Sequence, residues 1–396
     1  MKRFRRLHAS AALGVLYLAL AAGQAAAQDA NAVAQRLKES LATQGAELNW
    51  TSASGSGGQV VLDGVTYGAP GITPITLGKV TLDNVAEANG GYTAGTVTFP
   101  AFNFTQEGLT IVASESTLSN VRIPAPGQTD FMDSMLHYDS GVISSMEFKL
   151  GDRQVALVED TRFDMTPPEN GKISFTGSAS RLSADLTTIP DPKTQAVVSA
   201  LGYQQITGNA QLAGSWNTTD GRMELSRYDI AVDNAGKLGI TFDIGGYTPE
   251  FLKAMQEIQA QMAANPGGGD QNAQNVAMLG LMQQLVFNAA SVRFEDASLT
   301  GKAIDFLAKQ QGAEPAQLKE QTKTIVPFLL ASSPIKDEAL KKSIADAVST
   351  YIDDPRSLTI RAKPATPQPF SAIAAQGQAD PAALTSTLGV SVSAND

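Results

Sequence analysis

The sequence predicts an α+β protein built on an extended, curved antiparallel β-sheet, a meander, with a C-terminal cluster of helices packed on one face. Three observations predict this class. Apolar and polar residues alternate with period two through the middle of the chain, turn residues separate the alternating segments, and the apolar spacing becomes helical after residue 248. No β-α-β rhythm is present, so a parallel Rossmann-type sheet is not expected.

The first 27 residues have the organisation of a secretory signal peptide. A cationic segment, Lys2 to Arg6, precedes an apolar one over 11–23, and Ala25 and Ala27 provide the small side chains that signal peptidase requires. The apolar segment is shorter than the roughly 20 residues of a membrane-spanning helix. We therefore expect cleavage after Ala27, a periplasmic location and no stable membrane span afterwards. An uncleaved anchor is the alternative.

The composition excludes several classes of function. The chain has 29 basic and 39 acidic residues, and removal of residues 1–27 leaves 25 against 39, a net charge of −14. So acidic a surface argues against nucleic acid as a partner. The chain has no cysteine, which excludes disulfides, cysteine nucleophiles and thiolate metal sites. Since His8 lies in the removed segment, only His137 remains, and a site with several histidine ligands is excluded.

Residues 28–189 are expected to form a strand-rich region that begins with one short helix. Val33, Leu37 and Leu41 recur at helical spacing and predict a helix over 31–45. The alternating segments that follow contain parity slips, which predict curved rather than flat strands. The clearest of these strands are expected over 75–85, 96–104 and 109–123.

Alternation continues between residues 146 and 175, on both sides of turn signals at Gly151-Asp152 and Asn170-Gly171. These turns predict hairpins rather than crossover connections. Four apolar residues between the two turns have the same parity, which predicts that they share one face of the sheet: Val155, Leu157, Phe163 and Met165.

Residues 190–363 are expected to form an α+β region that opens with a short helix over 190–201. A three-stranded meander over 205–245 follows, because even-numbered apolar residues such as Leu212 and Trp216 alternate with polar ones. The turns are predicted at Asp220-Gly221 and at residues 233–236. The parity changes at Ser226-Arg227, which predicts a bulge or a bend.

Helices are expected over 248–352. Thr248 and Pro249 form a typical helix start, and Pro266 with three glycines separates the first helix from a second that includes Met282 and Val286. A strand is predicted over 291–299. Further helices are expected over 301–311, over 318–329, where Pro327 should kink or end the helix, and over 334–351; a closing strand should follow over 356–362, and a Pro- and Ala-rich tail with one or two short helices over 364–396.

No motif predicts catalysis or a cofactor. The Gly-x-Ser-x-Gly elbow of a serine hydrolase is absent, and although Asp139 could orient His137, no nucleophile accompanies the pair. The adjacent acids Glu295-Asp296 should point to opposite faces of a strand, so they do not form a carboxylate pair. The glycines at Gly55 and Gly57 lack the lysine of a phosphate-binding loop. A hydrolase that uses carboxylates is the least favoured hypothesis, and we expect a protein that is not an enzyme.

An apolar ligand is the only ligand class that the sequence indicates. Four of the ten methionines fall in two neighbouring predicted helices, and methionine adapts its shape to varied apolar partners. A groove between these helices and the sheet would bind a lipid or another apolar molecule, although an ordinary methionine-rich core is the alternative. The predicted lining residues are Met255, Ile258, Met262, Met278, Met282 and Leu285.

Some segments resemble known bacterial families. The run Ala200-Leu201-Gly202-Tyr203 leading into the meander, with Trp216 and the Asn234-Ala235-Gly236 turn, resembles the uncharacterised periplasmic proteins grouped as YdgA-like. The long alternating strands are similar to those of AsmA-like envelope proteins, and the ending Leu388 to Val392 with Asn395 resembles exported alphaproteobacterial proteins. The resemblance implies an envelope protein, and for the AsmA-like family a long apolar groove that handles lipids. No functional residue is transferred by it.

Two hypotheses of function follow. The first is a non-catalytic exported protein of envelope maintenance that binds lipid or another apolar ligand between helices and sheet. The second is an interaction scaffold with a fully packed core, which would bind another envelope protein through its acidic surface or an edge strand.

Overall fold

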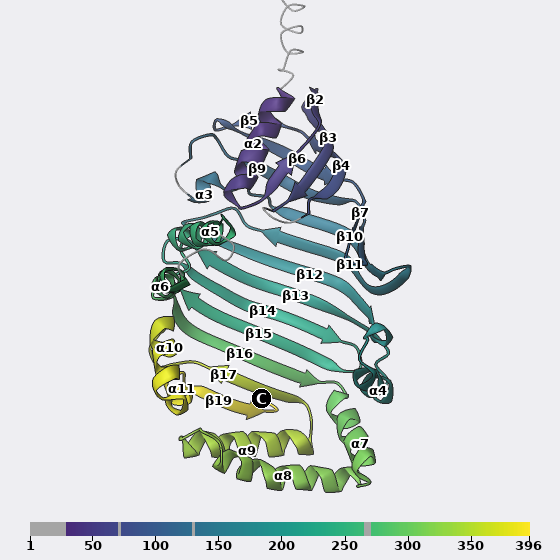
Figure 1. Ribbon diagram of the computed structural model, residues 1–396, viewed down its shortest axis with the longest axis vertical. Coiled ribbons are helices and arrows are strands. Elements are labelled where there is room, and N and C mark those ends of the chain that lie inside the picture. Colours follow the sequence, from purple (N-terminus) through teal and green to yellow (C-terminus); the bar gives the residue numbers. More distant parts are fainter. Residues whose placement is uncertain (1–28, 70–72, 129–130, 265–270) are drawn as a thin grey trace, which may run out of the picture. The chain divides into compact units, whose positions relative to one another are not determined.

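The computed structural model describes residues 29–69, 73–128, 131–264 and 271–396. The predicted signal peptide lies outside the described residues. The chain divides into two compact units, coloured along the sequence in Figure 1. The small unit consists of Met1–Phe102 and Glu115–Asp139, and the large unit of Asn103–Ser114 and Ser140–Asp396.

The small unit is a helix-covered antiparallel sheet. Its strands pair in the order β2–β3–β4–β6–β9, with β1 also on β3 and β5 also on β6. The elements are α2 (Ala30–Thr43), β1 (Glu47–Asn49), β2 (Ser52–Ser56), β3 (Gln59–Gly68), β4 (Ile75–Asp83), β5 (Ala86–Ala88), β6 (Gly91–Phe99), β9 (Ser116–Ile123) and α3 (Phe131–Ser134).

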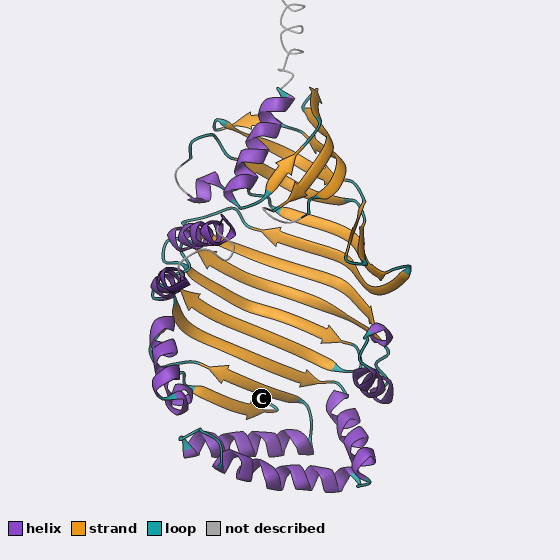
Figure 2. Cartoon of the chain, viewed as in Figure 1, coloured by secondary structure: helices purple, strands orange, loops and turns teal. Residues whose placement is uncertain are grey.

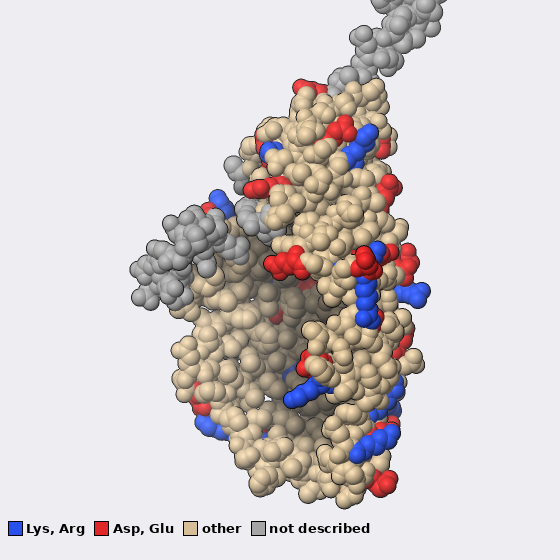
Figure 3. Space-filling model, turned by 45° about the vertical axis from the view of Figure 1, so that its right-hand side comes forward, with Lys and Arg blue, Asp and Glu red and all other residues tan. Residues whose placement is uncertain are grey.

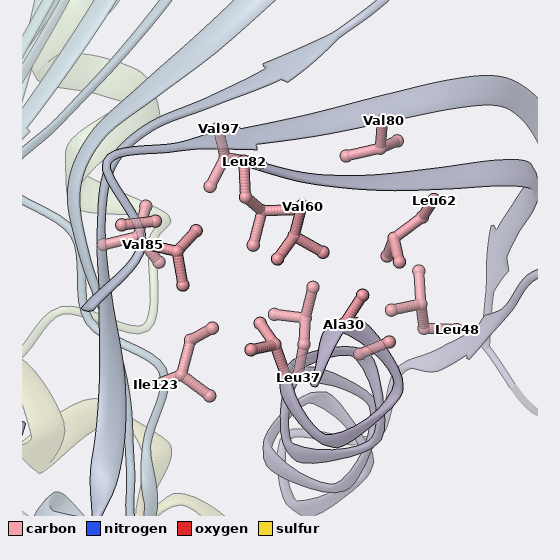
Figure 4. Close-up of a cluster of buried hydrophobic side chains, with 14 of the residues drawn as sticks. Ala30, Leu37, Leu48, Val60, Leu62, Val80, Leu82, Val85, Val97 and Ile123 are labelled. Carbon is pink, nitrogen blue, oxygen red and sulfur yellow. The ribbon is translucent and has the colours of Figure 1, made fainter. Parts of the chain in front are cut away.

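The core of the small unit lies between α2 and the sheet. The carboxylate of Asp29 caps α2 by accepting a hydrogen bond of 3.0 Å from the backbone N–H of Asn31. The apolar stripe of the helix then meets alternate residues of β3 and β4, such as Leu62 and Leu82, whose side chains are fully buried (Figure 4). The helix predicted over 31–45 is confirmed, and it provides the cover that one face of this sheet requires.

The large unit is built on a long antiparallel meander. Every strand is antiparallel to its neighbour in the order β8–β10–β11–β12–β13–β14–β15–β16–β17–β19, and the short β18 also pairs with β16. The strands are β7 (Phe102–Gln106), β8 (Leu109–Ala113), β10 (Ser140–Leu150), β11 (Arg153–Met165), β12 (Lys172–Asp185), β13 (Gln205–Asn217), β14 (Arg222–Val232), β15 (Gly236–Gly245), β16 (Val286–Asp296), β17 (Ser357–Ala362), β18 (Gln368–Pro369) and β19 (Val390–Ala394).

The described helices of the large unit lie at the ends of the strands and beside β19, and no helical layer crosses the middle of the sheet (Figure 2). This differs from the expected cluster packed on one face. The helices are η1 (Leu186–Thr188), α4 (Pro192–Leu201), α5 (Pro249–Ala264), α6 (Gln271–Met282), α7 (Leu299–Gln311), α8 (Pro315–Ala331), α9 (Glu338–Asp353), α10 (Phe370–Ala379), η2 (Pro381–Ala383) and α11 (Leu384–Thr387).

The last strand of the sheet is shielded by α9. The hydroxyl of Ser343 in this helix donates a hydrogen bond of 3.1 Å to the backbone carbonyl of Val392 in β19. An uncovered edge strand would present a row of unpaired backbone groups to other chains. The helix therefore protects this edge from further strand pairing.

Several predicted boundaries are corrected. The structure places Val286 at the start of β16 rather than in the preceding helix, because its backbone pairs with Gly245 and Pro369. The helix α8 continues past Pro327 to Ala331. The C-terminal tail adds β19 to the sheet by pairing with β17, which the sequence did not indicate. Among the described residues, no helix is both long and apolar enough to span a membrane.

Candidate functional site: an uncovered apolar face

The strand register of the large unit gathers apolar side chains on one face of the sheet. Residues that are directly opposite each other on paired strands project to the same face. Consecutive partners across β12 to β16 form an unbroken apolar row: Ile173, Trp216, Met223, Ile244 and Phe287.

Parallel rows extend this surface toward β19. One crosses β14 to β19 through Ile230, Leu238, Phe294, Leu358 and Ala394, and its neighbour crosses β15 to β19 through Ile240, Val292, Ile360 and Val392. On the other side, Met146, Val158 and Leu182 form a row across β10 to β12. These four rows contain no charged residue, and we call the surface that they form the apolar face.

The opposite face of the same strands is polar and is held together by cross-strand pairs. Arg222 donates to both carboxylate oxygens of Asp243, at 3.1 and 2.6 Å. Lys237 lies 3.0 Å from its cross-strand partner Glu295, whose carboxyl pKa is lowered by Lys237 and then by Arg293. Glu295, the first of the two adjacent acids noted in the sequence, therefore belongs to a salt-bridge network that stabilises the sheet.

The apolar face is not covered by other side chains at several places. Leu238, Val292 and Ile360, from two of the rows, are 38%, 44% and 49% exposed. Soluble monomers rarely expose contiguous apolar patches of more than a few hundred Å². A patch of this kind usually marks a binding surface.

Figure 3 shows that the large unit is hollowed and that the floor of the hollow is nearly free of charged residues, whereas charged residues gather along its outer surface. The charged side chains of β13 to β16 lie on the polar face, except that of Asp296 at the end of β16, which accepts hydrogen bonds from the backbone N–H groups of Ser298 and Thr300. The uncharged floor has the chemistry of the apolar face rather than that of the polar face. A concave apolar surface of this kind is the usual form of a site for an apolar ligand.

An aromatic cluster closes one end of the apolar face. The indole N–H of Trp216 donates a hydrogen bond of 2.7 Å to the carbonyl of Tyr247, whose ring lies 5.4 Å from that of Phe251 in α5. Phe287 meets Phe370 of α10 edge-to-face, with the ring centroids 6.2 Å apart. Burial raises the pKa of the Tyr247 hydroxyl, which keeps this end uncharged.

The predicted lining residues are divided between this cluster and the surface. Met255 and Ile258 are half-buried against Phe251, and Leu285 is buried beside them. Met278 and Met282 are exposed on α6 instead. The side chain of Met262 lies outside the described residues. The structure thus brings three of the six residues together, and their role in ligand binding stays a prediction.

The residues of the apolar face were not singled out from the sequence. The signal that could have found them is the continuous alternation of every strand from β10 to β19. We expected helices to pack on one face of the sheet, so an exposed apolar face was not anticipated. The exposure of side chains such as those of Leu238 and Ile360 is what identifies this face.

The small unit contains the only histidine outside the predicted signal peptide. The Nε2 atom of His137 lies 3.5 Å from Oδ1 of Asp139, and Nη2 of Arg122 lies 3.0 Å from the same oxygen. Burial lowers the pKa of His137, and the positive charge of Arg122 lowers it further. The Asp139 carboxylate is thus held by an arginine. The part of the chain that the structure describes contains no group of three acidic or histidine residues placed to hold a metal ion.

A polar pocket of about 430 Å³ lies at the other end of the meander, beside the start of α7. The ammonium group of Lys302 lies 4.1 Å from the centre of the Tyr203 ring, and the Tyr203 hydroxyl donates to the carbonyl of Asn234 at 2.7 Å. Asp233 also lines the pocket, so its charge offsets that of Lys302. These contacts join α7 to the β14–β15 turn, which is a structural role.

Comparisons with known proteins add one finding. Residues 229–395 match a protein-family model that is described as an uncharacterized protein. This match covers the last part of β14, the strands after it and the helices between them. A search of curated proteins gives no match to the chain.

Proposed function

We propose that the protein is a non-catalytic exported protein of the cell envelope that binds the acyl chains of a lipid along the apolar face. The observation that carries this proposal is the set of uncharged cross-strand rows in which Leu238, Val292 and Ile360 are still exposed. Covering these side chains with hydrocarbon would contribute about 0.8 kcal/mol for each buried methylene group. The predicted signal peptide supports a periplasmic location.

The dimensions of the face suit acyl chains. Neighbouring strands lie about 4.8 Å apart, so the distance from β10 to β19 across the sheet is about 40 Å. The hydrocarbon core of a bilayer is about 30 Å thick, so the chains of one leaflet reach about 15 Å. The apolar face therefore has room for the chains of at least one lipid.

The helices α5, α6 and α10 would close one end of this binding surface. Their aromatic cluster around Phe251 and Phe370 gives the surface an apolar end wall. Met255, Ile258 and Leu285 would contribute to this wall. The predicted groove between helices and sheet is then the closed end of a longer site.

The alternative function is an interaction scaffold with a fully packed core. The exposure of Val292 in β16 and Ile360 in β17 fits this alternative less well, because a packed core would bury them. A partner protein would also require polar groups to orient it, and the four rows have no charged side chain.

The test is binding of cis-parinaric acid, a fluorescent C18 fatty acid, to the purified and delipidated protein. Val292→Asp places a charge on the apolar face, and Val142→Asp is the matched control because Val142 is exposed on the polar face of the same sheet. We expect at least about tenfold weaker binding for Val292→Asp, because an unpaired charge is costly in hydrocarbon, and less than a twofold change for Val142→Asp.

Circular dichroism of both variants checks that the sheet is intact. Native mass spectrometry of the protein before delipidation should find bound phospholipid. Equal effects of the two substitutions, or a wild-type protein that binds no parinaric acid, would contradict lipid binding at this face.

A further inference from the structure

The helix α6 presents an apolar and uncharged surface to solvent. Val276 and Leu279 are 68% and 56% exposed, and Met278 and Met282 are each 38% exposed. None of the twelve residues of α6 is charged. The chain has 29 basic and 39 acidic residues, so an exposed helix without charge is unusual. The exposed side of a helix in a soluble protein normally carries charged or polar residues, and the exposed apolar side chains of α6 do not serve solubility.

The opposite side of α6 is fixed to the end of the apolar face. Leu281 is buried against Phe251, and Leu285 follows it in the same cluster. Two residues further on, Phe287 is part of the first apolar row. The exposed side chains of α6 therefore lie next to the closed end of the proposed lipid site.

We propose that the exposed surface of α6 docks on a lipid bilayer and so places the end of the apolar face against the membrane from which lipid enters. This inference rests on the proposed function. Docking buries Val276, Leu279 and the two methionines among acyl chains, which supplies binding energy in proportion to the apolar area. Since the helix has no cationic residue and the protein is acidic, the bilayer that it suits is zwitterionic rather than anionic.

A second helix with exposed apolar residues provides the comparison. Phe328 and Leu329 in α8 are 73% and 56% exposed. However, α8 contains Lys319, Glu320 and Lys323, and it packs against α7 and α9 rather than against the apolar face. We infer that α8 does not provide the membrane contact, although Phe328 is the more exposed side chain.

The experiment is flotation of the full mature chain with phosphatidylcholine vesicles. The double variant Val276→Asn/Leu279→Asn removes the apolar surface of α6, and Phe328→Asn/Leu329→Asn is the matched control on α8. We expect the α6 variant to float at least about fivefold less than the wild type and the α8 variant to float within twofold of it. Vesicles that contain phosphatidylglycerol should bind no more protein than phosphatidylcholine vesicles.

Binding of parinaric acid to the same variants separates this inference from the proposed function. The α6 variant should bind parinaric acid like the wild type, because its substitutions lie outside the apolar face. The inference is overturned if the wild type does not float, if both variants float alike, or if native mass spectrometry shows that the α6 substitutions break a dimer, since α6 would then contact a second copy. Loss of parinaric acid binding by Val292→Asp and Val142→Asp alike would overturn the proposed function instead.

Discussion

The two units use the same kind of strand in opposite ways. In the small unit, alternate residues of β3 and β4 such as Leu62 and Leu82 are fully buried, because α2 lies over that face of the sheet. In the large unit, equally apolar residues such as Leu238 and Ile360 stay exposed, because the described helices lie at the strand ends. The comparison teaches that period-two alternation predicts an apolar face but not what covers that face.

The two units should therefore be stabilised differently. Burial of side chains is concentrated under α2 in the small unit. In the large unit, much of the stabilising free energy must come from the backbone ladder and from polar cross-strand pairs such as Arg222 with Asp243. Three predictions sharpen this contrast, and they begin with the largest effect.

The substitution Leu62→Ala should destabilise the small unit by about 2–5 kcal/mol, because it leaves a cavity in a closed core. The substitution Leu238→Ala removes the same atoms from the apolar face and should cost less than about 1 kcal/mol in the ligand-free protein. Hydrogen exchange resolved by peptide measures the opening free energy of β3 and β15 separately. Equal losses of stability for Leu62→Ala and Leu238→Ala would show that the apolar face around Leu238 is covered.

The substitution Gly246→Ala should destabilise the large unit by about 2–3 kcal/mol. Gly246 has a φ of +79°, and a Cβ atom there would lie only 1.8 Å from the backbone carbonyl oxygen of Gln284, in the turn after α6. Gly202→Ala is the control, because Gly202 has nearly the same φ but no atom within 4 Å of the added carbon. Only the strain of a left-handed residue, about 1 kcal/mol, is expected there.

Urea unfolding of these two glycine variants provides the measurement. A larger loss for Gly246→Ala would support the view that close backbone contacts, rather than a side-chain core, hold the large unit together. A larger loss of stability for Gly202→Ala would show instead that the strain of a left-handed residue outweighs the close backbone contact at Gly246.

The smallest predicted effect concerns pH and the small unit. Burial lowers the pKa of His137 in the folded state below its usual value of 6.5. The unfolded chain therefore takes up a proton at a pH where folded His137 remains neutral, so the stability that this residue contributes is complete above pH 6.5 and is lost as the pH falls through the lowered pKa.

Thermal unfolding at pH 7.5 and 5.5 tests this sign. The wild type should lose more stability on acidification than His137→Gln, which cannot titrate. An identical loss in the two proteins would show that burial of His137 has no consequence for stability. Because Asp139 and Arg122 are present in both proteins, their own contributions cancel in the comparison.

Much of the meander could be predicted. The strands over 205–245 are confirmed, and the parity change at Ser226-Arg227 corresponds to a bulge against Ala213 and Gly214. A bulge in β12 between Ala179 and Leu182, which lie opposite residues on either side of Asp160 with its φ of +48°, was not predicted. It places Leu157 on the polar face, opposite Glu147, whereas Phe163 and Met165 lie on the apolar one, so the predicted shared face of these residues is wrong.

The candidate site was less predictable than the strands. The methionines of α5 and α6 suggested an apolar surface, yet Met278 and Met282 are exposed on the outer helix while Met255 lies in the cluster around Phe251. Helical spacing indicates that residues share a side of a helix. It does not indicate whether that side meets the sheet, the solvent or another molecule.

The sequence by itself determined the local structure: the alternation made strands, Asp220-Gly221 made a hairpin turn with Gly221 at a φ of +68°, and Asp29 began the first described helix. Only the tertiary structure decided that the apolar parities of successive strands join into one surface, because that depends on register and on unpredicted bulges. It also decided that α2 covers one sheet while the helices of the large unit flank the other. The packing of a helix is set by distant contacts, such as Ser343 with β19, which no local pattern encodes.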